Sequence, residues 1–509
     1  MHEMWKEHKI QGLSKIVVLA SLLLCSVLTF PISSWANPID VSAQVVVTST
    51  GFLYSRASKL YTGTLTITNN GPALSGTINV ALNGLPSGIM LHNATGQYNG
   101  SPMIKTSITG LATGKSITIS LQFSNPNSIK ITFVPVTLQE GSSAVAYQIN
   151  PAHSGYATFG HALTLPPSAA WSIKLGGTAS YPLIADGRAF VLTAGSSTGG
   201  YGTQLYALDL ATGSTVWGPV AIPGTYYWAG HTYDNGNIFV VNSDGLLKSF
   251  DAATGTAGWS ANVSGCSAPP TAANGIVYVV GGSSLQAVDE RNGNILWTEF
   301  VNDGNGSSPT ISNDGVFVAN ACDVYKFDLI YGYTFWYARD SCTGGLGKTA
   351  AYANGSLYVR GFCLNCQDGQ IFDAEIGNIT GHFGPYMPPG PPMPIPAFDL
   401  TAGYFLNGGT LQSENLSAQA VNWSFIGDGH LVSAPIVIDQ VVIIGSSTGN
   451  VYALDAQNGS ILWVGAAGSG ISAPDDLYVS SAFTGFGAGE GYLVVPAGDT
   501  VTAWLLTGQ

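Results

Sequence analysis

The chain has 509 residues, of which 45% are apolar, and this is enough for two or three domains with buried cores. Only 9% of the residues are charged whereas 65 are Gly, so the surface must consist largely of small polar side chains. The net charge of −13, with only 16 Lys and Arg, provides no basic surface. Nucleic acid and anionic membranes are therefore not expected as partners.

The N-terminal segment has the layout of a secretory signal peptide. Lysines precede an apolar run at residues 16–30, and the small residues Ser34 and Ala36 stand at positions −3 and −1 of a cut after Ala36. No later apolar stretch approaches the length of a membrane span. We predict a signal peptide over residues 1–36 and a secreted or extracytoplasmic protein, in the bacterial periplasm or outside the cell.

Residues 37–150 show period-two alternation of apolar and polar side chains. The clearest runs are residues 63–68, 76–82 and 116–123, with polar turns between them. Short alternating strands of this kind predict an antiparallel β-sandwich. The stretch 61–136 resembles the immunoglobulin-like modules of bacterial secreted proteins. That resemblance implies a spacing, docking or adhesion role rather than catalysis.

The remainder of the chain is a repeat with the pattern Ala-x-Asp-x-x-x-Gly-x-x-x-Trp. The spacing of its aspartates, (455 − 209)/6, gives a mean repeat of 41 residues. A copy at Asp373 and Gly377 has Gly381 at the Trp position, and a degenerate copy has Asn415, Gln419 and Trp423. The full or nearly full copies are Asp209, Gly213 and Trp217; Asp251, Gly255 and Trp259; Asp289, Gly293 and Trp297; Asp328, Gly332 and Trp336; and Asp455, Gly459 and Trp463.

Each member of the pattern has a physical task. The Asp can accept hydrogen bonds from the following turn, and the Gly permits a positive φ there. The Trp suits the gap between neighbouring radial sheets, where its N–H can find a carbonyl. With the apolar strands upstream, one repeat indicates four strands, which is a propeller blade.

The two ends of the repeat region predict how the ring closes. Residues 171–175 are typical of a fourth strand, and residues 501–505 of a third strand. Together they complete one blade, which removes the exposed sheet edges. The predicted fold is therefore all-β, with an immunoglobulin-like β-sandwich at 37–150, a linker at 151–169 and an eight-bladed β-propeller at 170–509.

The repeat resembles the tryptophan-docking repeat of the pyrroloquinoline-quinone (PQQ) propeller superfamily, the quinoprotein alcohol dehydrogenase-like fold. That superfamily contains dehydrogenases and also non-enzymatic members, such as a lipoprotein of outer-membrane protein assembly, so the fold alone does not choose between them. The resemblance implies that an enzyme would carry a disulfide of adjacent cysteines over PQQ, with Glu, Asn and Asp on calcium. The chain has no Cys-Cys pair. We therefore expect the non-enzymatic branch, with neither PQQ nor calcium and no catalytic, cofactor-binding or metal-binding residues.

Other candidate chemical groups are sparse. No two histidines of the mature chain have His-x-His or His-x-x-x-His spacing, so a metal-hydrolase site lacks its ligands. His231 is expected on an inner strand of the second blade, either facing the channel or bonded to a neighbouring loop. Asp475 and Asp476 are expected on an inner strand, where adjacent side chains would point to opposite faces.

Five cysteines follow the signal peptide, and an oxidising destination favours disulfides. Blade register places all five on one face of the propeller. The predicted pairs are Cys322 with Cys342 and Cys363 with Cys366, which leaves Cys266 free. A link from Cys266 to Cys322 is the competing arrangement.

The segment 384–396 contains seven prolines in thirteen residues and is expected to be extended and stiff. Tyr386, Met387 and Met393 could give it adaptable apolar contacts with a protein partner. The alternative is a rigid connector that covers the fifth blade. The predicted function is a secreted non-catalytic binding or scaffold protein. The alternatives are a PQQ-dependent dehydrogenase and a carbohydrate-binding propeller, in which exposed aromatic residues bind a glycan: Tyr226, Tyr227 and Trp228.

Overall fold

The computed structural model describes residues 39–507 with internal gaps. Cys266, Cys322, Cys342, Cys363 and Cys366 all fall in these gaps, so their predicted pairing lies outside the described residues. Among the described residues no helix is long and apolar enough to cross a membrane. The gaps are 72–73, 105, 107–108, 112, 160–162, 195–200, 266–267, 303–305, 321–322, 340–347, 361–366, 387–392 and 476–480.

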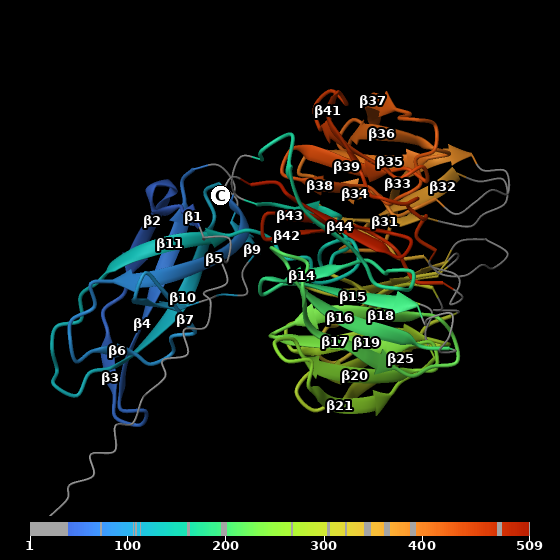
Figure 1. The fold of residues 1–509 in the computed structure, drawn as a ribbon. Helices are drawn as coiled ribbons and strands as arrows, with labels where there is room; N and C mark the ends of the chain where they lie inside the picture. The colour runs from blue at the N-terminus through green and yellow to red at the C-terminus, as the bar shows by residue number, and fades with distance from the viewer. Residues whose placement is uncertain are drawn as a thin grey trace, which may run out of the picture. The chain divides into compact units, whose positions relative to one another are not determined.

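The first part of the described chain forms two β-sheets (Figure 1). One sheet has the order β1-β11-β5-β8-β7, with β9 also on β5, and the other has the order β2-β4-β10-β6, with β3 on β4. The elements are β1 (Ile39–Asp40), the 3-10 turn η1 (Ser42–Gln44), β2 (Val45–Ser49), β3 (Leu53–Ser55), β4 (Leu60–Asn69), β5 (Leu74–Asn83), β6 (Met90–Leu91), β7 (Gly96–Tyr98), β8 (Ser101–Ile104), β9 (Thr109–Leu111), β10 (Ser116–Ser124) and β11 (Val134–Glu140).

The core of these two sheets follows directly from the alternation in the sequence. Leu65 and Ile67 on β4 are buried, as are Leu121 and Phe123 on β10, while the residues between them are more exposed. Successive side chains of a strand point to opposite faces, so each strand contributes one apolar face to a shared interior.

From residue 168 onward the described chain is organised as eight sheets of four antiparallel strands, which are successive in the chain in sheets 1–7. We number them by chain order. They are sheet 1, β14 (Leu183–Ala185), β15 (Arg188–Ala194), β16 (Thr203–Asp209), β17 (Thr215–Ile222); sheet 2, β18 (Ala229–Asp234), β19 (Asn237–Asn242), β20 (Leu246–Asp251), β21 (Ala257–Asn262); sheet 3, β22 (Thr271–Ala273), β23 (Ile276–Gly281), β24 (Ser284–Asp289), β25 (Ile295–Phe300); sheet 4, β26 (Thr310–Ile311), β27 (Val316–Ala319), β28 (Asp323–Phe327), β29 (Thr334–Arg339); sheet 5, β30 (Ala351–Ala353), β31 (Ser356–Arg360), β32 (Gln367–Asp373), β33 (Ile379–Tyr386); sheet 6, β34 (Ala397–Phe398), β35 (Ala402–Asn407), β36 (Thr410–Asn415), β37 (Ala420–Phe425); sheet 7, β38 (Ile436–Ile438), β39 (Val441–Gly445), β40 (Asn450–Asp455), β41 (Ile461–Ala466); and sheet 8, β42 (Gly487–Gly489), β43 (Tyr492–Ala497), β44 (Thr500–Leu505), β13 (Ser168–Lys174).

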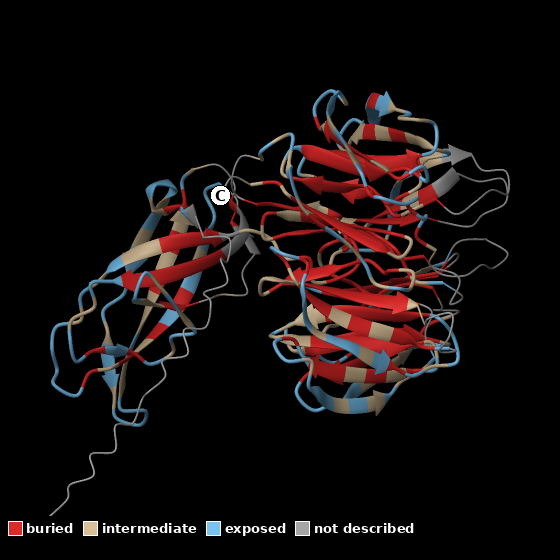
Figure 2. Cartoon of the chain, viewed as in Figure 1, coloured by how far each residue is buried: buried red, intermediate tan, exposed pale blue. Residues whose placement is uncertain are grey.

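Burial falls from the first strand of each sheet to the fourth. The second strands are almost wholly buried, the third strands such as β20 mix buried and half-buried residues, and β21 on the outside alternates between exposed and half-buried residues (Figure 2). The first strands of neighbouring sheets contact one another, as β14 contacts both β18 and β42. The arrangement is that of a β-propeller, with first strands innermost.

The ring closes through strands from opposite ends of this region. β13 pairs antiparallel with β44, with Trp171 opposite Ala503 and Lys174 opposite Thr500. Sheet 8 therefore takes its fourth strand from the start of the region and its other three from the end. This is the arrangement that residues 171–175 and 501–505 predict, and it leaves no unpaired edge at the junction.

Residues 142–159, which we call the plug, contact the innermost part of every sheet. This differs from the predicted boundaries: the last sandwich strand ends at Glu140, and most of the segment expected as sandwich end or linker packs inside the propeller. The hydrogen bonds run from Ala144 N to Ile184 O, Tyr233 N to Val145 O, Ile311 N to Pro151 O, Tyr352 N to Ala152 O, Phe398 N to Ser154 O, Val437 N to Gly155 O and Glu490 N to Ser142 O, while the His153 ring contacts Thr271 in sheet 3.

The plug is held in an unusual backbone conformation. Ile149 has a φ of 77° although it is β-branched, and Gln148 and His153 also have positive φ. Non-glycine residues adopt this region at a cost that the surroundings must offset. The contacts to all eight sheets supply that offset. The plug also contributes a short parallel strand, β12 (Tyr156–Ala157), to sheet 7.

Candidate functional site

The repeated tryptophans join each sheet to the next by the same geometry. The indole N–H of Trp217 donates to the carbonyl of Ala252 in the following sheet at 3.0 Å. Its ring lies over Gly255, where a Cβ atom would stand 2.6 Å from the ring, and Gly255 has a φ of +72°. Glycine is therefore required twice at this position, for the turn and for the ring.

The same contact recurs at other interfaces between sheets. In each case the indole donates to a carbonyl of the next sheet and covers the glycine of that sheet's turn. These contacts are Trp171 with Leu210 and Gly213, Trp259 with Glu290 and Gly293, Trp297 with Leu329 and Gly332, Trp336 with Ala374 and Gly377, and Trp423 with Ala456 and Gly459.

The aspartates of the pattern hold the turns that carry these glycines. Asp251 Oδ1 accepts hydrogen bonds from the N–H and the hydroxyl of Thr254, both at 2.8 Å. These bonds lower the pKa of Asp251. In the degenerate copy, Asn415 accepts from Ser417 in the same way, so the turn survives the loss of the charge.

The interface between sheets 5 and 6 breaks the pattern on both sides. Gly381 stands at the Trp position of sheet 5, and Gln419, with a φ of 49°, stands at the Gly position of sheet 6. The Gln419 amide nitrogen lies 2.6 Å from where a Cβ of Gly381 would be. At this interface the larger side chain therefore belongs to sheet 6 instead of sheet 5, and it is a flexible amide instead of an indole.

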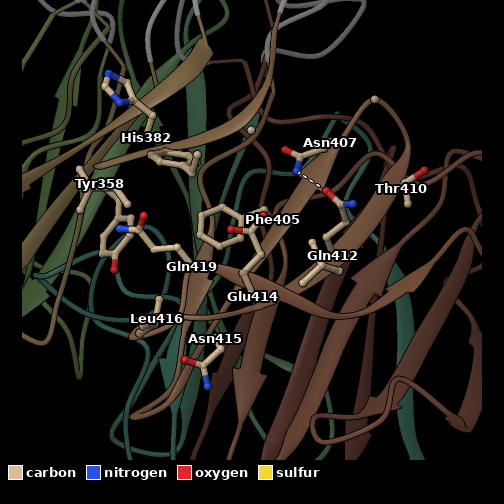
Figure 3. Close-up of a pocket in the computed structure, with 15 residues that line it drawn as sticks. Tyr358, His382, Phe405, Asn407, Thr410, Gln412, Glu414, Asn415, Leu416 and Gln419 are labelled. Atoms are coloured by element: carbon tan, nitrogen blue, oxygen red, sulfur yellow. Dashed lines mark hydrogen bonds between the residues drawn. The ribbon is translucent and has the colours of Figure 1, made fainter. Parts of the chain in front are cut away.

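A cavity of about 630 Å³ opens beside this exchanged pair (Figure 3). Its floor is aromatic and nearly buried, whereas its wall on sheet 6 is rich in carboxylate and amide groups. The lining residues are Tyr358, Ile371, His382, Phe383, Gly384, Phe405, Asn407, Gly408, Thr410, Gln412, Glu414, Asn415, Leu416, Gln419 and Val421.

Glu414 is the exceptional residue of this wall. It directly precedes the turn, at a position that is apolar and fully buried in six other sheets: Leu208, Phe250, Val288, Phe327, Phe372 and Leu454. Burial raises the pKa of Glu414, and the charge of Arg360 opposes that rise. No hydrogen-bond donor within the described ranges reaches its carboxylate. Figure 3 shows the side chain beside the ring of Phe405 in the cavity.

Arg360 lies behind the cavity and is almost completely buried. Its guanidinium donates to Asn407 Oδ1 and to Leu406 O, both at 3.3 Å, and lies over the ring of Phe383 at 5.3 Å. It also contacts the Met393 sulfur at 3.3 Å. These guanidinium contacts are with neutral groups, and none of them is with Glu414.

A second cavity, of about 680 Å³, lies between sheets 6 and 7 beside the plug. Its carboxylates are already satisfied. Asp399 accepts from Thr401, Ala402 and Tyr404, and Asp439 accepts from Thr158 and Phe159 of the plug. These groups serve turns and plug attachment, so the cavity between sheets 5 and 6 is the better candidate site.

The innermost strands carry buried polar groups that contact the neighbouring sheets. His231 lies on β18, as the sequence predicts, and its Nε2 lies 3.2 Å from Phe190 O. Burial lowers its pKa to about 4. Its main chain is bonded to the Tyr181 hydroxyl. His231 is thus a neutral histidine bonded to the neighbouring sheet.

Sequence reasoning missed His153 of the plug, because a lone histidine in an expected linker gives no signal. Its Nδ1 lies 2.7 Å from Tyr147 O, and its Nε2 lies 3.0 Å from Pro309 O and 3.3 Å from Thr271 Oγ1. A neutral ring has one N–H, so it donates to one of these two carbonyls at a time. Burial lowers the pKa of His153 to about 4.

Two sequence expectations are wrong. Trp228 is only 1% exposed, so it cannot join Tyr226 and Tyr227, which are exposed, in a glycan platform. Asp475 lies outside any strand, because the innermost strand of sheet 8 is β42, which begins at Gly487. Trp228 instead fills the core beside β18.

The proposed partner loop is described only in part. Met393 is 8% exposed and packs on Arg360, as a connector would require. Tyr386 ends β33, but its side chain lies outside the described residues, as does all of Met387.

A quinone with calcium would need a cluster of oxygen ligands and space for the ring system. No group of three or more His, Cys, Asp or Glu side chains within the described ranges is placed to hold a metal ion. Near the axis, where such a cofactor could contact all sheets, the plug hydrogen-bonds to the innermost strands. We derive no chemistry through PQQ.

The chain has a β-propeller fold, and part of its repeat region is similar to a PQQ-type repeat family. Residues 202–340 match the sequence profile of the family described as outer membrane protein assembly factor BamB. No curated protein matches the sequence.

The similar solved structures include both branches of this fold. BamB from Moraxella catarrhalis is 18% identical with a TM-score of 0.50, covering 68% of this chain and 100% of that one. Quinohemoprotein alcohol dehydrogenase from Comamonas testosteroni is 15% identical with a TM-score of 0.52, covering 72% and 81%. The computationally designed protein Ika8 is 14% identical with a TM-score of 0.51, covering 67% and 100%. Similarity that extends to a designed protein identifies the fold alone.

Proposed function

We propose that this chain is a secreted, non-catalytic binding or scaffold protein, in which an immunoglobulin-like sandwich precedes a closed eight-bladed propeller. The observation that carries the proposal is the plug. A single segment of the chain hydrogen-bonds to the innermost part of the sheets all round the ring, so these strands serve to hold the fold together at the place where an axial active site would form.

A protein partner is supported by an exposed aromatic cluster at the outer edge of sheet 4. Tyr331 and Tyr333 are 67% and 68% exposed, and Phe335 and Tyr337 on β29 are also exposed. Aromatic residues are enriched at protein interfaces. The cluster lies within the segment that matches the BamB family, whose name describes a role in assembling outer membrane proteins. An extracytoplasmic location, in the periplasm or outside the cell, agrees with the predicted signal peptide.

The partner surface is tested by two matched triple variants. One replaces Tyr331, Tyr333 and Phe335 with Ser, and the other replaces the exposed apolar residues Ile461, Leu462 and Val464 of β41 with Ser. Crosslinking in intact secreting cells should give a specific product with the parent and with the second variant, and this product should be absent with the first variant. Loss with both, or with neither, would remove this cluster from the proposal.

The proline-rich segment is tested separately because its residues have different surroundings. We expect Met393→Ser to lower the melting temperature, since Met393 is buried against Arg360. Tyr386→Ser and Met387→Ser should reduce partner capture without that thermal effect if the loop binds a partner. If capture survives in both, the segment is a connector only.

The alternatives are tested on the purified protein. PQQ and calcium are added, and quinone absorbance and alcohol-dependent dye reduction are recorded; turnover would overturn the scaffold proposal. A glycan array tests the carbohydrate alternative, for which Tyr226 and Tyr227 remain exposed. Non-reducing peptide mapping tests the proposed pairs Cys322 with Cys342 and Cys363 with Cys366.

A further inference from the structure

We propose that the cavity between sheets 5 and 6 binds the cationic end of an organic amine or guanidine, with Glu414 as its charged partner. The inference goes beyond the scaffold role, since it concerns a small ligand site and needs no protein partner. Its basis is the replacement of a docking tryptophan by an open space that contains a carboxylate to which no described residue donates a hydrogen bond.

The first argument is the charge of Glu414. A partly buried carboxylate without a hydrogen-bond donor is costly, and the cost falls when a donor, above all a cationic one, pairs with it. Arg360 stabilises the charge from a distance, but its donors are directed at Asn407 and Leu406. The carboxylate therefore retains its full capacity for hydrogen bonds toward the cavity.

The second argument is an acceptor that the broken pattern leaves available. At six other interfaces, the carbonyl that follows the turn Asp accepts an indole N–H, as Ala374 accepts from Trp336 at 3.1 Å. The equivalent carbonyl in sheet 6 belongs to Leu416, which lines the cavity. No donor in the described part of the chain hydrogen-bonds to it. Glu414 and Leu416 thus present two acceptors to one space, and the Gln419 amide can complete the set (Figure 3).

The third argument is the shape and lining of the cavity. Its volume of about 630 Å³ falls within the range of small-molecule sites. Phe405 and Tyr358 form an apolar floor on which methylene groups can pack. An anion would be repelled by Glu414, and a neutral alcohol would leave its charge unpaired. The lining therefore selects an alkyl chain that ends in an ammonium or guanidinium group.

Such a group could come from a free small molecule or from a Lys or Arg side chain of a peptide, and separate probes distinguish these sources. Isothermal titration of the full mature chain uses pentylamine, pentylguanidine and the neutral control pentanol. Acetylated, amidated Gly-Lys-Gly and Gly-Arg-Gly form the peptide arm. We expect saturable binding of at least one cationic probe and none of pentanol. Binding confined to one arm identifies the source.

Glu414→Gln removes the charge and keeps the shape, and we expect it to weaken binding about tenfold or more. Glu299→Gln, on the outer strand β25, makes the same change in net charge and should leave affinity unaltered. Melting temperatures of both variants establish that they fold. Equal binding of pentanol, no binding of any cationic probe, or unchanged affinity of Glu414→Gln would each overturn the proposal.

Discussion

The interfaces on the two sides of sheet 5 are built from the same repeat and have opposite outcomes. On one side, Trp336 of sheet 4 covers Gly377 and donates to Ala374. On the other side, Gly381 faces Gln419, and a cavity remains. The comparison shows that the Trp and Gly positions act as one unit, because the ring fits only where the opposite residue has no side chain.

The open interface is held together by aromatic residues that also line the cavity. The rings of Phe383 and Phe405 lie 5.0 Å apart across sheets 5 and 6, and Tyr358 contacts Phe398 at 4.2 Å. Aromatic pairs of this kind contribute beyond their buried area. These aromatic contacts therefore join sheets 5 and 6 at the floor of the cavity, where the docking indole is missing.

The largest expected effect comes from removing a docking indole. Trp423→Ala deletes a ring that is 9% exposed and its bond to Ala456 at 2.9 Å. We expect the free energy of unfolding to fall by about 3–5 kcal/mol, measured by urea denaturation. A loss below about 1 kcal/mol would show that the indole contacts do not join the sheets.

The next largest effect distinguishes the contribution of the Trp ring to stability from the contribution of the backbone turn. Gly377→Ala places a methyl group 2.5 Å from the Trp336 ring at a φ of +76°, whereas Gly355→Ala in the same sheet has a similar φ of +81° and open space. Both variants incur backbone strain of about 1 kcal/mol, but only the first also displaces the ring. We expect Gly377→Ala to lower the free energy of unfolding by roughly 1–3 kcal/mol more than Gly355→Ala does. Equal losses in matched thermal melts would contradict this role of the ring.

The smallest effect is a pH dependence confined to the open interface. Burial raises the pKa of Glu414, so the folded state resists its ionisation. Its stabilising contribution is present below the unfolded pKa of about 4.3 and is lost as pH rises through the folded pKa. Glu414→Gln should therefore gain stability relative to the parent between pH 4 and 8, by less than about 1 kcal/mol because the group is partly exposed.

Among the described residues, the other charged and titratable groups around Glu414 are Arg360, His382 and Tyr358, and they are present in both proteins. Subtracting the two stability curves therefore isolates Glu414. A difference that is flat from pH 4 to 8 would contradict the assigned pKa direction.

The repeat could be predicted from sequence because each of its residues has a local task. The Asp, Gly and Trp spacing carries the turn, the positive φ and the ring. The pairing of residues 171–175 with 501–505 also follows from the repeat, since an incomplete copy at each end is visible in the sequence. Gly381 indicates where the cavity between sheets 5 and 6 lies. It does not indicate which chemical groups line that cavity.

The plug and the cavity could not be predicted because their contacts are nonlocal. Residues 142–159 have no period, and their hydrogen bonds reach partners up to about the other end of the chain, such as Glu490. Glu414 looks like an ordinary strand residue of a degenerate copy. Comparison with the buried apolar residues at the same place in other copies, such as Leu454, is the signal that could have identified it.

The central claim is that loss of one Trp and Gly pair created the ligand cavity, and restoring the pair tests it directly. The double variant Gly381→Trp with Gln419→Gly should raise the free energy of unfolding by roughly 1–3 kcal/mol, because the ring regains its glycine and a carbonyl. Titration with pentylamine should then show no binding. A double variant that is no more stable than the parent and still binds pentylamine with the parent's affinity would contradict the account.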